Sequence, residues 1–222
     1  MFHVEHRGSI SSWQAMFHVK HCAIHSIKQR WNHAMPSPER LVILDRDGVI
    51  NQDSDSYVKS LDEWLPYPSA IEAIARLCRA GWSVAVATNQ SGIARGYFDI
   101  DTLDAMHRVL MRLVNQAGGQ IDHIAYCPHG PDDGCKCRKP LPGLLEEIRD
   151  TLGLETLKGS WMVGDSLRDL QAGEPMGCHG ALVKTGKGEK TLAKGVGLDN
   201  AVIFDDLSAF VDWLLAGGQS ST

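Results

Sequence analysis

Short apolar runs alternate with amphipathic segments along most of the chain. The run Leu41–Leu44 has four consecutive aliphatic residues, which is typical of a strand buried on both faces of a parallel sheet. Similar runs predict further strands at 83–88, 121–126, 160–164, 179–184 and 201–204. Apolar residues at helical spacing predict helices at 68–80, 99–116, 143–154, 166–176 and 207–216. This alternation predicts an α/β fold, a parallel sheet with helices on both faces.

Polar residues directly follow three of the predicted strands. Asp45 and Asp47 come after the first strand, Thr88 and Asn89 close the second, and Asp165 follows the fourth. Because the carboxyl ends of parallel strands meet at one edge of a sheet, we expect these side chains to share one crevice. Several carboxylates in one crevice repel each other unless a divalent cation lies between them, and oxygen ligands favour Mg²⁺.

Taken singly, each of these features also has an ordinary structural explanation. The acids around Gly48 suit a plain turn, Thr is common at strand ends, and a single lysine such as Lys139 is usually solvated. The segment from Gly186 to Lys190 is interpreted as a flexible basic loop near the sheet edge that is exposed to solvent, and a contact to substrate is the alternative. The interpretation of the site therefore depends on the features occurring together.

Four potential metal ligands crowd into eleven positions: Cys127, His129, Cys135 and Cys137. Three thiolates and one imidazole are the ligand types and number of a closed tetrahedral Zn²⁺ site. A closed site is structural, because it leaves no coordination position for water. The alternative is an unligated cluster of reduced thiols. A disulfide framework fits less well, because the other cysteines are scattered.

Charge and hydropathy exclude some partners. The formal net charge of −5 does not suggest a nucleic-acid partner, since proteins that bind phosphate backbones usually carry a basic patch. We find no apolar run near the ~20 residues of a membrane span, and no apolar block of a secretory signal at the N-terminus. These observations predict a cytoplasmic protein without a membrane partner.

The N-terminal region looks foreign to the rest of the chain. The hexapeptide at 1–6 recurs at 16–21 with one change. The codons ATG TTT CAC GTG AAA CAT would encode the second copy and form a perfect DNA palindrome. Our hypothesis is that residues 1–34 are a translated regulatory DNA element and that Met35 is the true start. We expect a disordered extension, one domain and a short tail, at 1–38, 39–217 and 218–222.

The polar motifs resemble, in order, the four motifs of the haloacid dehalogenase (HAD) superfamily, across almost all of residues 40–215. They are Asp45-Arg46-Asp47-Gly48, Thr88-Asn89, Lys139 and Gly164-Asp165-Ser-x-x-Asp169. The resemblance implies a three-layer Rossmannoid HAD-like fold. It implies that Asp45 attacks phosphorus to form an aspartyl-phosphate and that Asp47 is the general acid and base. It implies that Thr88 and Lys139 hold the phosphoryl group, and that Mg²⁺ is bound by Asp45, by Asp47 through its carbonyl, and by Asp165.

A narrower resemblance rests on the cysteine-rich loop, on Arg138-Lys139-Pro140 after it, and on the segment 89–96. These features resemble the D-glycero-D-manno-heptose-1,7-bisphosphate 7-phosphatases. The resemblance implies a small, capless, monomeric enzyme that removes the C7 phosphate of a phosphorylated sugar, in the synthesis of activated heptose for lipopolysaccharide. It implies contacts to substrate from Arg46, Asp53, Tyr57, Thr88, Asn89, Gln90, Ser91, Arg138 and Lys139. Some members have Lys after the magnesium-binding Asp, where this chain has Ser166, so a second phosphate contact stays open.

Two other functions are alternatives to this heptose phosphatase interpretation. Histidinol-phosphate phosphatases can have a zinc loop of the same spacing, but they tend to read Thr-Asn-Gln-Asp-Gly where residues 88–92 read Thr-Asn-Gln-Ser-Gly. A non-catalytic zinc module that binds nucleic acid or a partner belongs to a different class. The chain lacks the basic stripe with interleaved aromatic residues that a nucleic-acid module would show.

Overall fold

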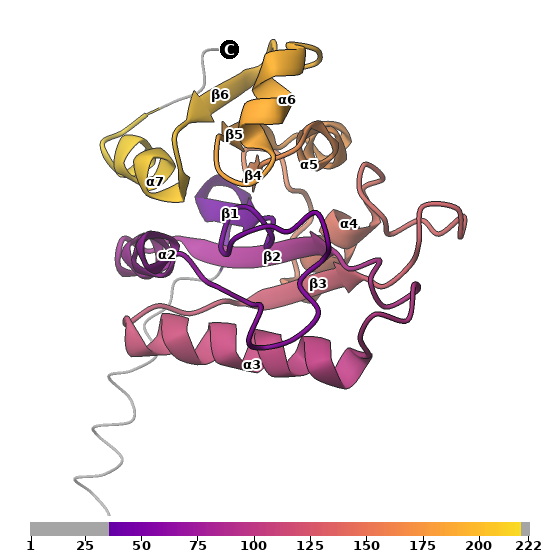
Figure 1. The fold of residues 1–222 in the computed structure, drawn as a ribbon. Coiled ribbons are helices and arrows are strands. Elements are labelled where there is room, and N and C mark those ends of the chain that lie inside the picture. The colour runs from indigo at the N-terminus through magenta and orange to yellow at the C-terminus, as the bar shows by residue number, and fades with distance from the viewer. Residues whose placement is uncertain (1–35, 219–222) are drawn as a thin grey trace, which may run out of the picture. The chain divides into compact units, whose positions relative to one another are not determined.

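The computed structural model describes residues 36–218. Most of the predicted extension and of the predicted tail lies outside these described residues, as does the proposed foreign segment at 1–34. Within the described range, the chain folds around a sheet of six parallel strands (Figure 1). The strand order is β3-β2-β1-β4-β5-β6. The strands are β1 Leu41–Leu44, β2 Ser83–Asn89, β3 His123–Cys127, β4 Trp161–Gly164, β5 His179–Val183 and β6 Ala201–Phe204.

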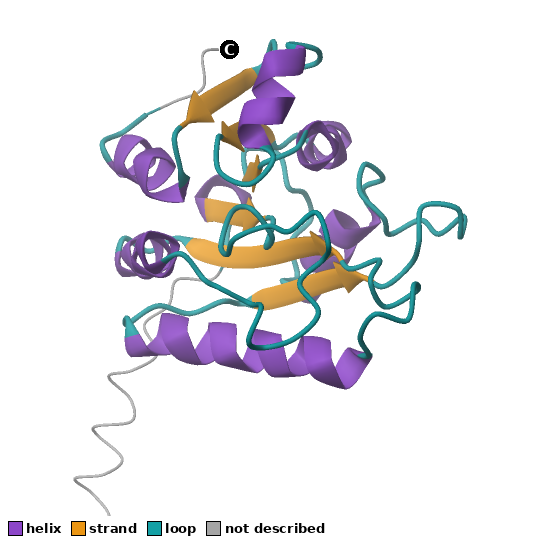
Figure 2. Cartoon of the chain, viewed as in Figure 1, coloured by secondary structure: helices purple, strands orange, loops and turns teal. Residues whose placement is uncertain are grey.

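Helices cover both faces of this sheet (Figure 2). One face packs against α2 Pro68–Arg79, α3 Ile100–Gln116 and α7 Leu207–Leu215. The other face packs against α4 Gly143–Thr151 and α5 Leu167–Gly173. The remaining elements are α6 Gly188–Lys194 and two 3₁₀ turns, η1 Pro38–Arg40 and η2 Glu174–Met176. This is the three-layer parallel α/β arrangement that the sequence predicted.

The first strand shows why the apolar runs form this core. All four residues of β1 are fully buried. Val42 and Leu44 join the core beneath α2, α3 and α7, whereas Leu41 and Ile43 join the core beneath α4 and α5. Successive side chains of a strand point to opposite faces, so a continuous apolar run satisfies two helical layers at once. The prediction of a doubly buried strand is confirmed.

The structure corrects two predicted elements. The predicted helix at 166–176 ends as α5 at Gly173 and continues as a 3₁₀ turn, because Pro175 has no N–H to continue the helical hydrogen bonds. The segment interpreted as a flexible basic loop contains the start of α6. The helix has no strong apolar face. Contacts to the rest of the domain hold it, including a hydrogen bond from Thr191 Oγ1 to the Asp165 carbonyl, 2.9 Å.

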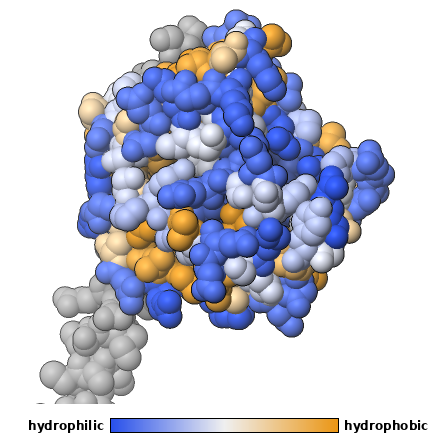
Figure 3. All heavy atoms as spheres, viewed as in Figure 1, coloured by the Kyte–Doolittle hydropathy of each residue, from blue (hydrophilic) through white to orange (hydrophobic). Residues whose placement is uncertain are grey.

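Three further features of the described residues concern the helices, the surface and the connections between motifs. None of the helices between residues 36 and 218 is both long enough and apolar enough to cross a bilayer. The face shown in Figure 3 is largely polar, and its apolar groups lie in small separate areas. In the same range, the connections between the predicted motifs contain no separate cap domain.

Candidate active site

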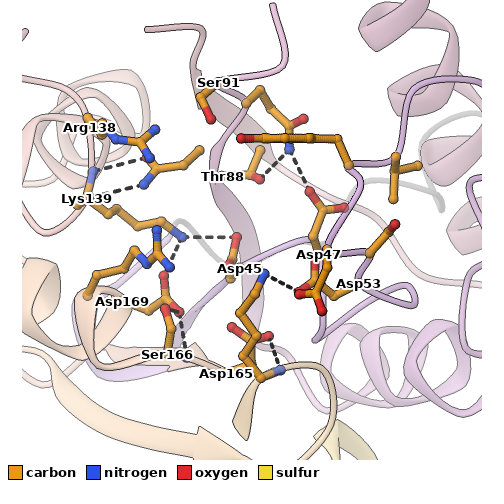
Figure 4. A pocket seen from close by; sticks show the side chains of 18 of the residues that line it. Asp45, Asp47, Asp53, Thr88, Ser91, Arg138, Lys139, Asp165, Ser166 and Asp169 are labelled. Atoms are coloured by element: carbon orange, nitrogen blue, oxygen red, sulfur yellow. Dashed lines mark hydrogen bonds and ion pairs between the residues drawn. The ribbon is translucent and has the colours of Figure 1, made fainter. Parts of the chain in front are cut away.

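The strand order places a crevice at the carboxyl end of β1. From β1 the chain moves outward to β2 and β3, and then returns to β4 on the other side of β1. Ligands bind at such switch points in open α/β sheets. A cavity of about 270 Å³ lies there, and Figure 4 shows Asp45, Asp165 and Lys139 around the same space. The cavity brings together residues that are far apart in the sequence.

The predicted site residues fall into two groups by position. Those that line the cavity are Asp45, Asp47, Asp53, Tyr57, Thr88, Asn89, Gln90, Ser91, Arg138, Lys139 and Asp165. Arg46 does not line it, because its side chain is fully buried behind Asp47. The substrate contact predicted for Arg46 is therefore absent from this arrangement. Its guanidinium contacts protein groups instead.

Lys139 lines the cavity and is 2 % exposed. Its Nζ is 3.0 Å from Asp45 Oδ1 and 2.8 Å from Asp169 Oδ1, and it donates to the Ala87 carbonyl at 2.6 Å. Burial alone would lower the pKa of Lys139, but the two carboxylates outweigh it and raise the pKa. Asn89 holds the Lys139 backbone through hydrogen bonds of 3.0 and 3.1 Å. The lysine is thus a fixed buried cation.

Three carboxylates face each other beside this lysine. Asp45, Asp165 and Asp169 each offer an oxygen, and these oxygens lie within 4.8 Å of one another. Burial, with repulsion from the neighbouring acids, raises the pKa of Asp45 to about 6 despite Lys139, and that of Asp165 to about 8. A shared divalent cation would relieve this repulsion, and an all-oxygen donor set suits Mg²⁺. The carboxylate of Asp47 is not part of this group, which fits a ligand role through its carbonyl alone.

Asp165 is held by the connection between β5 and α6, which sequence reasoning missed. The Lys187 N–H donates to Asp165 Oδ2 at 2.8 Å. Two glycines lie against the same carboxylate, since a Cβ on Gly48 or Gly186 would lie 2.0 or 2.2 Å from Asp165 Oδ2. Both glycines have positive φ, +87° and +57°. Only residues without a side chain fit this corner.

Asp47 accepts four hydrogen bonds from three side chains. Its Oδ1 accepts from Arg46 Nε at 3.0 Å and from Asn51 Nδ2 at 2.9 Å. Its Oδ2 accepts from Arg46 Nη2 at 3.0 Å and from Gln90 Nε2 at 2.9 Å. Burial, the largest single effect, would raise the pKa of Asp47. The Arg46 charge and these hydrogen bonds together outweigh it and lower the pKa.

The mouth of the cavity carries charged residues from several elements. Lys187 pairs with Asp53, and Lys190 lies 3.7 Å from Asp55. Arg168, at the start of α5, also lines the cavity, and it makes no hydrogen bond or ion pair with any described residue. Neither Lys187 nor Arg168 was among the predicted site residues. Arg168 is an unspecified position of the Gly164-Asp165-Ser-x-x-Asp169 motif, and Lys187 directly precedes α6. The packing of their segments brings both to the cavity.

Tyr57 stands out in the loop between β1 and α2. It has a left-handed backbone, with φ of 66°, which is uncommon for a residue with a side chain. Its ring lies 5.1 Å from the Tyr97 ring, and the Arg95 guanidinium lies 5.8 Å from the Tyr57 ring centre. These contacts hold an aromatic side chain at the cavity wall.

The predicted zinc ligands converge in the loop after β3. The Cys127 Sγ lies 3.7 Å from Cys135 Sγ and 3.2 Å from Cys137 Sγ, and His129 Nδ1 lies 3.6 and 3.3 Å from the thiols of Cys127 and Cys137. Tetrahedral Zn²⁺ with Zn–S bonds of about 2.3 Å separates its ligand atoms by about 3.5–3.8 Å. The donor types fit Zn²⁺, and the observed separations of 3.2–3.7 Å lie in or slightly below this range. The next residue, Arg138, donates to the His129 carbonyl at 3.2 Å, so this loop and the cavity wall are connected.

The parallel sheet, the acids at its switch point and the buried lysine define a HAD-like hydrolase, a phosphoric monoester hydrolase. A HAD-hydrolase-like family model matches residues 136–210. The chain is 60% identical over 175 residues to D-glycero-beta-D-manno-heptose-1,7-bisphosphate 7-phosphatase of Pseudomonas aeruginosa, a match covering 79% of this chain and 97% of the relative. The chain belongs to the family of D-glycero-β-D-manno-heptose-1,7-bisphosphate 7-phosphatases.

Solved structures agree with this assignment. The D,D-heptose 1,7-bisphosphate phosphatase of Bordetella bronchiseptica, in complex with magnesium and phosphate, superposes with a TM-score of 0.77 at 53% identity. That match covers 81% of this chain and 99% of the other. The enzyme of the same name from Burkholderia thailandensis gives 0.63 at 43% identity, covering 80% and 99%. The names of these similar proteins favour the heptose bisphosphate phosphatases over the histidinol-phosphate phosphatases.

Proposed function

We propose that this protein removes the C7 phosphate of D-glycero-D-manno-heptose 1,7-bisphosphate, as a cytoplasmic monomer in the synthesis of activated heptose for lipopolysaccharide. The observation that carries the proposal is the cluster of Asp45, Asp165, Asp169 and Lys139 at the switch point of a chain 60% identical to such an enzyme. Neither a plain turn nor a structural zinc module requires three acids around a buried lysine.

Asp45 is the nucleophile in this proposal. A carboxylate oxygen of Asp45 attacks phosphorus, the bond from phosphorus to the C7 oxygen breaks, and an aspartyl-phosphate forms. Water then attacks the same phosphorus and releases inorganic phosphate, which restores Asp45. The Nζ of Lys139, 3.0 Å from Asp45 Oδ1, and the Thr88 hydroxyl neutralise and hold the phosphoryl oxygens.

Asp47 handles the protons of both steps. It gives a proton to the leaving sugar oxygen in the first step and takes one from the attacking water in the second. The low pKa of Asp47 in the free protein means that its protonated form has to be stabilised once the anionic substrate is bound.

Two metal ions complete the site. Asp45, the Asp47 carbonyl and Asp165 would hold Mg²⁺, which supplies positive charge beside the nucleophile and the phosphoryl group. Cys127, His129, Cys135 and Cys137 would hold Zn²⁺, which stabilises the fold of their loop.

A second phosphate on the substrate is supported by the charge at the cavity mouth. Arg138, Arg168 and Lys187 line the cavity, and Arg168 makes no ion pair with the described residues. Cations around the opening favour a substrate with an anionic group at each end. These cations offer the second phosphate a contact in place of the lysine that some relatives have at the position of Ser166.

The test is a substrate panel with the wild-type protein and Asp45→Asn. We expect release of phosphate from the heptose bisphosphate, with the sugar 1-phosphate as the product by ³¹P NMR, and a much lower kcat/KM for histidinol phosphate. Asp45→Asn should lose at least about 10³-fold in kcat. Asp101→Asn, an exposed acid on α3, is the matched control.

Three results would overturn this proposal. Preference for histidinol phosphate would favour the alternative phosphatase, and release of the C1 phosphate would reverse the site of attack. Full activity of Asp45→Asn would remove the nucleophile and favour a non-catalytic role for the zinc loop.

A further inference from the structure

Gln90, predicted as a substrate contact, has its amide fully engaged by the protein. It follows β2 directly and is 4 % exposed. Its Nε2 donates to Asp47 Oδ2 at 2.9 Å and to Thr88 Oγ1 at 2.8 Å. Its Oε1 accepts from Arg46 Nη2 at 3.1 Å. One amide therefore joins the proton-transferring acid to the hydroxyl that holds the phosphoryl group.

The orientation of this amide is fixed by chemistry. A guanidinium only donates hydrogen bonds, so the atom of Gln90 that faces Arg46 has to be the oxygen. The NH₂ group then faces Asp47 and Thr88, and both of its hydrogens are used. Arg46 is fully buried and also binds Asp47 through two hydrogen bonds of 3.0 Å, so the anchor of the amide is itself fixed.

The bond to Thr88 determines what the hydroxyl can do. A hydroxyl carries one hydrogen to donate and lone pairs to accept. Because Thr88 Oγ1 accepts from Gln90, its own hydrogen is left to donate, and it donates to no acceptor among the described residues. Thr88 lines the cavity, so that hydrogen is available to an oxygen of a bound phosphoryl group.

We propose that Gln90 is a positioning residue that fixes the Asp47 carboxylate and the Thr88 hydroxyl at one spacing and aims them at the leaving oxygen and the phosphoryl oxygens. The inference rests on the proposed function. It replaces the substrate contact predicted for Gln90 and gives buried Arg46 a role as the anchor.

The two chemical steps respond differently when Asp47 is misplaced. In the first step the phosphorus–Asp45 bond forms, the bond to the leaving oxygen breaks, and Asp47 gives that oxygen a proton. An aryl ester with a weakly basic leaving group, such as 4-nitrophenolate, needs no proton there. In the second step water attacks phosphorus, the bond to Asp45 breaks, and Asp47 takes the proton of water whatever the substrate was. Loss of positioning should therefore slow the second step of aryl ester hydrolysis and both steps for a sugar phosphate.

The experiment compares Gln90→Met and Gln90→Glu with the wild-type protein. Methionine keeps the length without hydrogen bonds, and glutamate keeps the shape and an acceptor for Arg46 but loses the NH₂ group. We expect kcat on the sugar bisphosphate to fall about 10²-fold in both variants, with KM within about twofold of wild type. With 4-nitrophenyl phosphate, rapid mixing should show a burst of about one nitrophenolate per active site, larger than in wild type, followed by slow turnover.

Several results would overturn the inference. Wild-type kcat in Gln90→Glu would show that catalysis needs the packing of this side chain and not the hydrogen bonds that its NH₂ group donates. A raised KM with unchanged kcat would make Gln90 a substrate contact, and equal losses on both substrates without a burst would indicate a general defect. Gln116→Met, exposed at the end of α3, controls for the substitution, and Gln90→Glu provides the test should Gln90→Met fail to fold. Wild-type protein inactive on every phosphate ester would instead overturn the proposed function, and the inference with it.

Discussion

The acid Asp165 shows how much of a site can depend on residues that carry no reactive group. Its carboxylate receives the Lys187 N–H at 2.8 Å, and the backbone of Gly48 and Gly186 lies against it. Among residues 36–218, no charged side chain neutralises it within hydrogen-bonding distance, in contrast to Asp45, which pairs with Lys139. Main-chain groups therefore set the position of this acid. Changes in that main chain should weaken metal binding more than they destabilise the fold.

Replacing Gly186 by alanine should weaken Mg²⁺ binding at least about tenfold, because the new Cβ would lie 2.2 Å from Asp165 Oδ2 and has to displace that carboxylate. Titration calorimetry with Mg²⁺ measures the change. Gly195→Ala is the matched control, because Gly195 has a similar φ of +61° but has nothing within 4 Å of its added Cβ. Both variants should lose about 1 kcal/mol of stability from the left-handed backbone. Equal Mg²⁺ affinities in the two variants would contradict the prediction.

Binding of Mg²⁺ should release protons, and the affinity should fall as pH falls. Burial and mutual repulsion raise the pKa of Asp165 to about 8 and that of Asp45 to about 6, so both carboxyls hold protons at a pH where free aspartates are ionised. The cation binds carboxylates, so lowering the pH through these two values adds protons that it has to displace. Calorimetry in two buffers of different ionisation enthalpy counts the protons. An affinity independent of pH would show that these acids are not the ligands.

The sequence indicated some of these residues and could not indicate others. Asp45, Thr88 and Asp165 were predictable because each follows a buried apolar run, and a parallel sheet brings such ends together. Lys187 and Arg168 were not. Each comes four residues after a strand end, but a basic residue in such a segment is usually solvated, and only the packing of the chain places these two at the cavity. A residue that reaches the site only through tertiary packing leaves no signal in the sequence around it.

At the scale of elements, the strongest periodic patterns were the most informative. All six strands were predicted. The two central strands, β1 and β4, gave the clearest signal, because a strand buried on both faces has to be apolar at every position. The short helix α6 was not, because its seven residues include only one large apolar side chain, Leu192, and so show no apolar stripe. The early end of α5 could have been predicted, because Pro175 was visible in the sequence.

The loop between β3 and α4 should depend on Zn²⁺ for its shape. Cys135→Ser removes one ligand, so we expect loss of bound zinc and at least about a tenfold fall in kcat/KM, because Arg138 and Lys139 follow the loop directly. Zinc is measured by mass spectrometry of the metal and activity by phosphate release. Cys178→Ser is the control, since Cys178 lies outside the cluster. Full activity in a Cys135→Ser protein that has lost its zinc would separate the loop from the reaction.

At the scale of the whole molecule, the part from Pro36 onward has its own core. Both helical layers and the sheet between them lie within residues 36–218, and so do all the site residues described above. The match to the Pseudomonas aeruginosa relative covers 97% of that protein with 79% of this chain. A domain with a complete core should fold and act without the residues that precede it.

Deletion of residues 1–34 should leave kcat unchanged and the melting temperature within about 2 °C. A longer deletion through Arg40 is the contrast, because it removes the Pro38 carbonyl that accepts from Ser160 Oγ at 2.9 Å. Ser160 is fully buried, so losing that partner should cost about 1–3 kcal/mol. Scanning calorimetry and phosphate release check both forms. A loss of stability or activity with the shorter deletion would assign the preceding segment a role in this domain.

Lys187 acts through two different parts of the same residue. Its main-chain N–H holds Asp165, whereas its side chain pairs with Asp53 at the opening of the cavity. Every replacement except proline keeps the N–H. A saturation library at this codon would therefore vary the charge and shape at the entrance while Asp165 keeps its main-chain hydrogen bond. Protein engineers who want to change which sugar phosphate enters could begin at this position.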